Sequence, residues 1–403
     1  MKRIDGFWWS ALFGVPSLLA LALFLFGQSP AAAQRPPIKV GLLNVRTGPF
    51  TVPGETLDRG FRLALEEANY EVAGRKIEVI AEDDANDPAL GLTKVRKLVE
   101  KDRVHILIGP IGSSVALAMR DYMVEKGLPW IITQATVATL TREKRAPNIF
   151  RISFTDEQLH APMGRYFHDK LGLKKLAVVA PDFVAGYTQS GAFEKSFASA
   201  GGQVTQKIMV PLGAPDPAPY IARINTQAID GVHAILFGAD ALRFIKQAKE
   251  FGLMEKTRFT AMGSAVEEGS MLLAYGDEVV GMLNYNNYAA DFEGPATKRF
   301  VAAYRAKSGG RVPTQQAAMG YEGGRLIIEA AKLVGGNVED VPGVLAAIRK
   351  VDFVGPRAPI RFDGCQNLNI TVYVRKVVRV GGQLQHTVVD TVPGVVDPGC
   401  PVR

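Results

Sequence analysis

The chain has 403 residues, of which 47 are Lys or Arg and 40 are Asp or Glu, so its formal net charge is +7. The basic residues are scattered, as at Lys94, Arg96 and Lys174, which favours solvated faces over a nucleic-acid or membrane patch. The length and the 47% content of hydrophobic residues are typical of a globular protein with two domains.

Residues 1–33 have the pattern of an export signal. A positively charged start precedes an apolar run over 12–26, and three alanines at 31–33 provide an A-x-A-like cleavage site. An uncleaved membrane anchor is the alternative, because the aromatic residues 7–9 extend the apolar stretch. Proline and glycine breakers leave too short a clean span for an anchor to be preferred, so we predict a cleaved signal peptide.

After the signal, short apolar strands alternate with amphipathic helices. Strands are predicted at 38–43, 76–81, 104–109 and 129–132, and helices at 55–69, from Pro88 onward and from Ser113 through Met123. This βαβ spacing predicts a parallel sheet that is covered by helices on both faces.

The pattern then restarts with strands at 149–152, 176–180, 204–210, 233–237 and 258–262, the first of them followed by a helix over 155–171. Helices at 293–306, 314–334 and 341–350 follow, and strands at 369–379 and 383–391 form a hairpin through Gly381-Gly382. The sequence therefore predicts an α/β fold of two successive lobes with a closing C-terminal β tail. A cleft between two such lobes suits a ligand clamp that closes by hinge motion.

The loop over 109–114 joins a buried strand to a helix and consists mainly of small residues. The free N–H groups of a helix N-terminus favour an anion, and in open α/β sheets ligands bind at the carboxyl ends of strands. One hypothesis is that a ligand carboxylate or another polar group binds Ser113. The alternative is that Ser113 and Ser114 only cap the helix.

Motifs for catalysis are missing from the sequence. The 109–112 loop has two glycines but not the third that a dinucleotide-binding fingerprint requires. No phosphate-loop lysine follows a glycine-rich turn, and the hydrolase motif G-x-S-x-G is absent. Asp83 and Asp84 are adjacent on a strand and point to opposite faces, which favours a turn and a helix cap at Asp87 over acid–base chemistry. The five histidines are spread along the chain. We predict no enzyme activity, no cofactor and no metal site.

The two cysteines, Cys365 and Cys400, both lie in the C-terminal tail. In an exported protein such a pair is expected to form a disulfide, and two free buried thiols are the alternative.

Taken together, several segments resemble the bacterial periplasmic solute-binding proteins of the leucine/isoleucine/valine-binding type, which serve ABC importers. The segments that carry the resemblance are 38–41 with 47–49, 60–69, 82–88, 109–114, 238–240 and 248–253. The resemblance covers nearly the whole mature chain. It implies a periplasmic protein of two Rossmann-like lobes joined by a multi-crossover hinge, the type I periplasmic-binding fold. It also implies a small-molecule ligand between the lobes, closure on binding, and permease subunits as partners of a monomer.

On this basis we assign 38–153 with 287–352 to lobe 1 and 154–286 with 353–403 to lobe 2.

The resemblance also implies site residues. In the family, the positions that match Ser113 and the segment Ala135-Thr136 hold the carboxylate and amino group of an amino acid. The second lobe usually presents an aromatic residue where this chain has Ala185, and Phe183 fills the same space. The glutamate that meets the ligand ammonium in the family aligns near Ala265.

Asp240 is one replacement for that glutamate, and Glu267 is another, although we expect Glu267 to be exposed. A buried ammonium needs a charged or well-bonded partner, so we favour an aromatic or short aliphatic acid over a branched-chain amino acid. The full set of predicted ligand contacts is Phe50, Ile111, Gly112, Ser113, Gln134, Ala135, Thr136, Phe183, Asp240 and Tyr285.

Two other functions compete with an importer component. A ligand sensor for a membrane receptor belongs to the same binding class, and a secreted serine hydrolase that uses Ser113 belongs to another. No base is placed by the sequence to activate Ser113, which disfavours the hydrolase.

Overall fold

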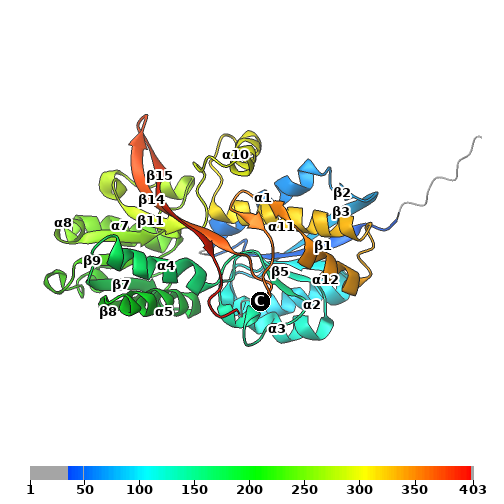
Figure 1. Cartoon of the computed structure of the whole chain (residues 1–403), viewed down its shortest axis with the longest axis horizontal. Coiled ribbons are helices and arrows are strands. Elements are labelled where there is room, and N and C mark those ends of the chain that lie inside the picture. The colour runs from blue at the N-terminus through cyan, green and yellow to red at the C-terminus, as the bar shows by residue number, and fades with distance from the viewer. Residues whose placement is uncertain (1–34, 49, 401–403) are drawn as a thin grey trace, which may run out of the picture. The chain divides into compact units, whose positions relative to one another are not determined.

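The computed structural model describes residues 35–48 and 50–400, so the predicted signal peptide lies outside the described residues. Two sheets organise the chain (Figure 1). The first has the order β2-β3-β1-β4-β5-β6 and the second the order β15-β14-β11-β10-β9-β7-β8. The predicted α/β architecture with two mostly parallel sheets and C-terminal strands is confirmed.

The first sheet consists of β1 (Ile38–Asn44), β2 (Glu71–Val72), β3 (Arg75–Asp83), β4 (Ile106–Ile108), β5 (Trp130–Ile132) and β6 (Ile149–Arg151). All neighbours pair in parallel except β2 and β3. The apolar strands are buried on both faces: Ile106 and Ile108 pack with one core cluster, and Leu107 packs with another.

Helices cover both faces of this sheet, and the first core cluster contains residues of α1 (Thr51–Glu67), α11 (Gln315–Leu333) and α12 (Val341–Lys350). The opposite face packs against α2 (Pro88–Arg96) and α3 (Ser113–Lys126). Asp87 caps α2 through the N–H of Leu90, as its position before Pro88 predicted.

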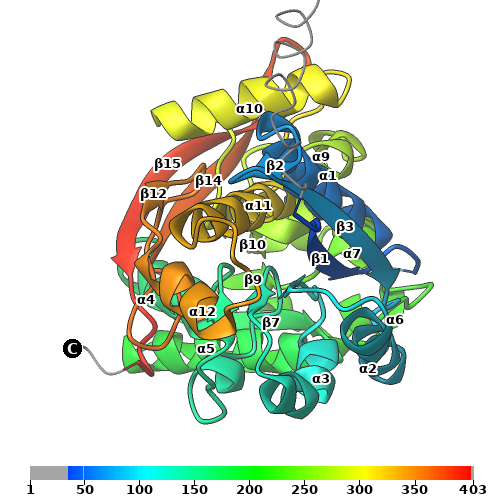
Figure 2. The same ribbon diagram turned by 90° about the vertical axis from the view of Figure 1, so that its right-hand side faces the viewer.

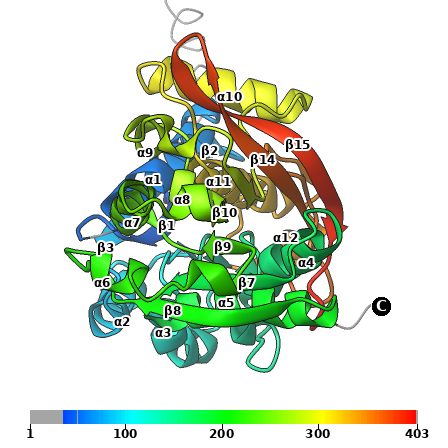
Figure 3. The ribbon, with the colours of Figure 1, turned by 90° about the vertical axis from the view of Figure 1, so that its left-hand side faces the viewer.

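The second sheet contains five parallel strands, β7 (Lys175–Pro181), β8 (Gln203–Val210), β9 (Gly231–Ala234), β10 (Arg258–Met262) and β11 (Leu283–Asn286). The predicted hairpin is present as β14 (Ile370–Val380) and β15 (Gln383–Val395), which extend this sheet in antiparallel fashion (Figure 3). Its faces are covered by α4 (Asp156–Asp169) and α5 (Val184–Ser199) on one side and by α7 (Gly238–Glu250) on the other.

The remaining elements are short or peripheral. Helix α10 (Pro295–Lys307) packs with α1 and α11, and the others are α6 (Ala218–Ile221), α8 (Leu253–Lys256), α9 (Ser270–Leu273), β12 (Phe353–Val354) and β13 (Pro359–Ile360). Ile360 and Leu368 lie in the core of the first sheet. The lobe boundaries that we assigned from the sequence stay a prediction, and this packing favours moving 353–368 to the first lobe.

The C-terminal tail returns from the second sheet to the first. Cys400 forms a disulfide with Cys365, as predicted. Asp397 is buried and accepts hydrogen bonds from Arg142 and from the side-chain amide of Asn367. The tail is therefore fixed next to the segment through which the chain crosses between the sheets.

Helices α1 and α11 lie side by side, and glycines allow their close approach (Figure 2). A methyl group on Gly60 would overlap the carbonyl oxygen of Ala317, and one on Gly320 would overlap that of Leu57. This contact fixes the start of α11, which lies at the site described below.

We predict that Gly60→Ala destabilises the fold by more than about 2 kcal/mol, because the two helix backbones must separate. Gly191→Ala is the matched control: it also lies within a helix, but no atom lies within 4 Å of the added methyl group. This control should be neutral or stabilising by up to about 1 kcal/mol. Denaturant unfolding measures both, and equal effects would contradict the packing argument.

Candidate functional site

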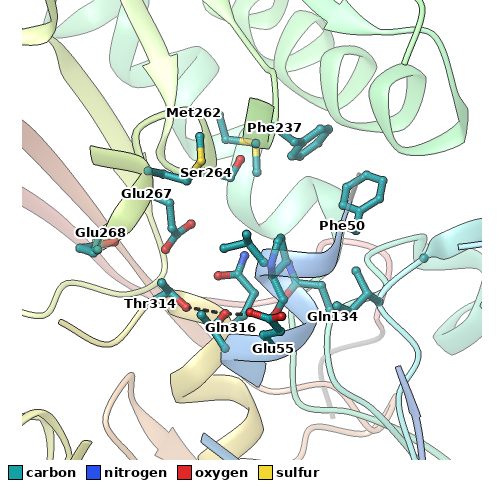
Figure 4. Close-up of a pocket in the computed structure, with 18 of the residues that line it drawn as sticks. Phe50, Glu55, Gln134, Phe237, Met262, Ser264, Glu267, Glu268, Thr314 and Gln316 are labelled. Atoms are coloured by element: carbon teal, nitrogen blue, oxygen red, sulfur yellow. Dashed lines mark hydrogen bonds between the residues drawn. The ribbon is translucent and has the colours of Figure 1, made fainter. Parts of the chain in front are cut away.

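A cavity of about 280 Å³ lies where loops of the two sheets face each other (Figure 4). Its wall combines strand-end loops of both sheets with the start of α11. The main lining residues are Phe50, Glu55, Asn86, Ile111, Gly112, Ser113, Gln134, Thr136, Phe183, Gln189, Phe237, Gly238, Met262, Ser264, Glu267, Glu268, Thr314 and Gln316.

Five helices, α1, α3, α5, α7 and α11, begin at this cavity, since residues at or beside each N-terminus line it. Within the described chain, no side chain caps the first four of these helices, whose N-cap residues are Phe50, Gly112, Phe183 and Phe237. Of these five helices, α11 alone carries a side-chain cap, from Thr314. Uncapped N–H groups and helix dipoles place positive partial charge at these N-termini, which favours an anion there.

Three of these N-cap residues are aromatic and form a cluster. The ring centroids of Phe50, Phe183 and Phe237 lie 6.4 Å, 6.5 Å and 6.0 Å apart in the three pairs. Phe50 follows β1 of the first sheet, and the other two follow β7 and β9 of the second sheet. The cluster therefore supplies an apolar contact surface to which loops of both sheets contribute.

Ser113 connects the first-lobe loops of the cavity. The helix begins at Ser113 itself with Gly112 as its N-cap, so the predicted capping role of the serine is wrong. Its buried Oγ accepts hydrogen bonds from the backbone N–H groups of Thr136 (3.2 Å) and Val137 (3.4 Å). Because a hydroxyl both accepts and donates, the Ser113 proton stays available for a ligand oxygen.

Seven of the ten predicted contacts line the cavity: Phe50, Ile111, Gly112, Ser113, Gln134, Thr136 and Phe183. They share one origin, because each lies between the carboxyl end of a parallel strand and the first residue of the next helix, that first residue included. The structure therefore brings the strand-end residues together at one place.

Ala135 and Asp240 do not line the cavity. The carbonyl of Ala135 accepts hydrogen bonds from Arg151 and Ser153. Asp240 forms an ion pair with Arg243 one turn along α7 and accepts a hydrogen bond from the N–H of Gly213 (2.8 Å). Asp240 thus has partners near it in the sequence rather than in the cavity.

Tyr285 is buried behind the cavity and packs under α4 and α5. Its hydroxyl contacts His160 Nδ1 (2.7 Å) and His233 Nε2 (3.0 Å). Burial lowers the pKa of each histidine to about 3, so both are neutral. The residue expected as a cavity wall instead completes an internal polar cluster.

Sequence reasoning named Glu267 as a possible ammonium partner but missed its burial and the neighbouring Glu268. Glu267 was expected to be exposed, but only 6% of it is, and its carboxyl group accepts a hydrogen bond from the N–H of Gln315 (3.0 Å). The neighbouring Glu268 is ion-paired with Arg375 and lies 3.5 Å from His386. Both glutamates follow the carboxyl end of β10, and that position was the available signal.

The two glutamates carry different charges at neutral pH. Burial and the nearby charge of Glu268 raise the pKa of Glu267 to about 8. Burial also opposes ionisation of Glu268, but Arg375 and then His386 outweigh it and lower that pKa to about 2. The cavity therefore presents a neutral carboxyl group from Glu267 beside a buried, compensated carboxylate.

The family model described as "Periplasmic binding protein" matches residues 37–379. The chain belongs to this family. This periplasmic binding protein is 28% identical over 389 residues to "Leu/Ile/Val-binding protein homolog 6" of Brucella melitensis, with 95% of this chain and 98% of the relative covered. The family consists of solute-binding proteins rather than enzymes.

Two solved structures extend the comparison. An ABC transporter substrate-binding protein from Sphaerobacter thermophilus is 35% identical, with a TM-score of 0.85 over 90% of this chain and 100% of that chain. A solute-binding protein of an ABC transporter from Rhodopseudomonas palustris BisB5, in complex with 3,4-dihydroxybenzoic acid, is 31% identical. Its TM-score is 0.84, and the match covers 90% of this chain and 99% of that chain. This periplasmic binding protein is thus similar to substrate-binding components of ABC transporters. Across 35–48 and 50–400, none of its helices combines the length and apolar character that a membrane span requires.

The raised pKa of Glu267 predicts a pH-dependent stability difference. The folded protein keeps this proton up to about pH 8, whereas the ordinary value of 4.5 applies to the unfolded chain. The contribution of the protonated Glu267 to folding stability is fully present below pH 4.5 and is lost as the pH rises through 8, because the unfolded chain releases this proton more readily than the folded protein. Glu267→Gln cannot ionise, so its free energy of unfolding relative to that of wild type should rise by at least about 1 kcal/mol from pH 5 to pH 9.

Denaturant unfolding at the two pH values measures this change. Glu55→Gln serves as the control, because Glu55 lines the same cavity but is exposed. If Glu267→Gln shifts stability equally at pH 5 and pH 9, the neutral state of Glu267 is contradicted.

Proposed function

We propose that this protein captures a small aromatic carboxylate between its two lobes and delivers it to the permease of an ABC importer. A short aliphatic acid is the nearest alternative within the same class. The observation that carries the proposal is the convergence of uncapped helix N-termini on a cavity with a phenylalanine cluster. The N–H groups favour the carboxylate, and the rings of Phe50, Phe183 and Phe237 favour a flat apolar body.

In the proposed complex, the ligand carboxylate binds the first turn of α3 and the hydroxyl of Ser113. The aromatic ring contacts Phe50 from one lobe and Phe183 with Phe237 from the other, so the ligand holds the lobes together. A ligand that bridges two lobes stabilises their closed arrangement, which is what a permease can recognise. We propose that the protein works as a periplasmic monomer after removal of residues 1–33.

A branched-chain amino acid is the competing ligand. Glu267 lies in the cavity, so the absence of a glutamate near Ala265 no longer excludes an ammonium partner. Against this ligand, Glu267 is neutral, and the negative charge of Glu268 is already compensated by Arg375. The proposal therefore keeps the aromatic acid as the ligand.

Thermal unfolding of the mature protein in the presence of benzoate, short fatty acids and leucine tests the proposal. A ligand that binds only the folded state at 100 times its Kd adds about 2.7 kcal/mol of stability, a clear shift in Tm. We expect stabilisation by benzoate and none by leucine. Stabilisation by leucine without any by benzoate would contradict the proposal.

The role of Ser113 gives a second expected outcome. Ser113→Ala should weaken benzoate binding roughly 10- to 100-fold, because a hydrogen bond to a charged group contributes about 1.5–3 kcal/mol. Ser114→Ala is the matched control: Ser114 follows in the same helical turn but is not among the residues that line the cavity. Equal Kd values for wild type and Ser113→Ala in calorimetry would remove Ser113 from the site.

The transport role has its own test, because a sensor would bind the same ligand. Genes for a permease and an ATPase beside this gene support import. A receptor kinase gene in their place supports sensing.

A further inference from the structure

The C-terminal tail, residues 396–400, contains a buried carboxylate. Strand β15 carries this tail back to the first sheet (Figure 1), where Asp397 is only 1% exposed. Its oxygens accept hydrogen bonds from the guanidinium of Arg142, the side-chain amide of Asn367 (3.1 Å), the hydroxyl of Thr155 (3.4 Å) and the N–H of Gly399 (3.2 Å). A buried charge is costly unless it is paired and hydrogen-bonded, and these partners meet both conditions.

Asp397 contacts both ends of the segment that leads away from the first sheet. Arg142, which lies 255 residues earlier, follows the loop after β5, and Thr155 caps α4, the first helix after β6. Gln158 completes the capping box with Thr155 and also donates to the carbonyl of Val395 at the end of β15 (3.2 Å). The tail therefore fixes this segment at two points.

A series of hydrogen bonds continues from Asp397 to the cavity. Asn367, which donates to Asp397, accepts from Nε of Arg151 (3.2 Å). Arg151 donates to two carbonyls of the 135–137 loop, and two N–H groups of the same loop donate to Ser113 Oγ. The tail carboxylate is thus connected to the hydroxyl that lines the cavity.

The position of the 135–137 loop depends on these bonds, because the loop has no regular secondary structure. Arg151 holds it from one side and Ser113 from the other. Burial lowers the pKa of Arg151 to about 10, and the charges of Asp156 and Asp397 oppose this decrease. Without Asp397, Asn367 and Arg151 lose the group that orients them, and a binding site tolerates displacements of only about 0.5 Å.

We propose that Asp397 is a positioning residue for ligand binding. Through Asn367 and Arg151 it holds the 135–137 loop, and with it the Ser113 hydroxyl, in the orientation that receives the ligand. This inference rests on the proposed function for the contact between Ser113 and the ligand. Because coupling between two sites is reciprocal, a ligand that fixes Ser113 also stabilises the tail.

A double-mutant cycle, measured by calorimetry with benzoate on the mature protein, tests the inference. The amide of Asp397→Asn has one acceptor oxygen and cannot receive Arg142 and Asn367 on opposite oxygens. The Kd should rise at least about fivefold in the wild-type background and change less than about twofold in Ser113→Ala. An equal factor in both backgrounds, or an unchanged Kd in both, would overturn the inference.

Glu339→Gln is the matched control for stability. Glu339 pairs with the buried Arg75 and is not among the residues that line the cavity. Both variants therefore take a carboxylate from an arginine, and both should lower the free energy of unfolding. Only Asp397→Asn should weaken benzoate binding, and equal weakening by Glu339→Gln would show that lost stability alone is the cause.

Amide hydrogen exchange on the wild-type protein tests the same coupling even if Asp397→Asn fails to fold. The N–H of Gly399 donates to Asp397, and the N–H of Gly343 donates in the same way to Asp340 (3.1 Å) at the start of α12. Saturating benzoate should slow exchange at Gly399 at least about fivefold and at Gly343 less than about twofold. An equal change at the two glycines would contradict the inference.

The outcomes separate this inference from the proposed function. If benzoate binds and its Kd does not depend on Asp397, the aromatic-acid function stands and the positioning role is wrong. If wild type does not bind benzoate, the proposed function fails, and the same cycle is measured with leucine as the competing ligand. A Kd for leucine that does not depend on Asp397 would then overturn the inference.

Discussion

The direction of the parallel strands is the constraint on which the site depends. Each parallel strand ends at the same edge of its sheet, and the helix that follows begins there. Two such edges face each other in this protein, so the N-termini of α1, α3, α5 and α7 meet at one cavity. The chain leaves these helices without side-chain caps, and a ligand anion can take the place of a cap.

A buried polar network around Arg151 supports this arrangement. Arg151 is fully buried at the end of β6 and donates to the carbonyls of Ala135 and Val137, and also to the side chain of Asn367. Asn367 donates in turn to Asp397 in the disulfide-anchored tail. A continuous hydrogen-bonded network thus links the C-terminal tail to the loop whose N–H groups hold Ser113.

The fold and half of the site follow from local sequence patterns. Apolar runs with βαβ spacing determine the strands, and Gly381-Gly382 marks the hairpin, so the architecture could be predicted. The strand-end rule located Ser113, because it depends only on where a strand stops, whereas Thr136 and Phe183 came from the family resemblance. The same rule applied to the run that ends at Phe237 would also have found that ring.

The rest of the site depends on contacts between distant residues. Tyr285 lies on a strand whose two faces are both buried, so the sequence does not reveal that it packs toward α4 and His160. Glu268 can be buried because Arg375, 107 residues further along the chain, compensates its charge. Glu267 can be buried because it stays protonated. Side-chain charge alone predicts exposure for both glutamates, and only the tertiary structure corrects it.

The central claim is that uncapped helix N-termini bind the ligand through a negative charge. Comparing benzoate with benzamide tests this most directly, because the two differ in charge and hardly in shape. The account predicts that calorimetry on the mature protein gives a Kd at least about tenfold lower for benzoate. Equal affinities, or tighter binding of benzamide, would contradict it.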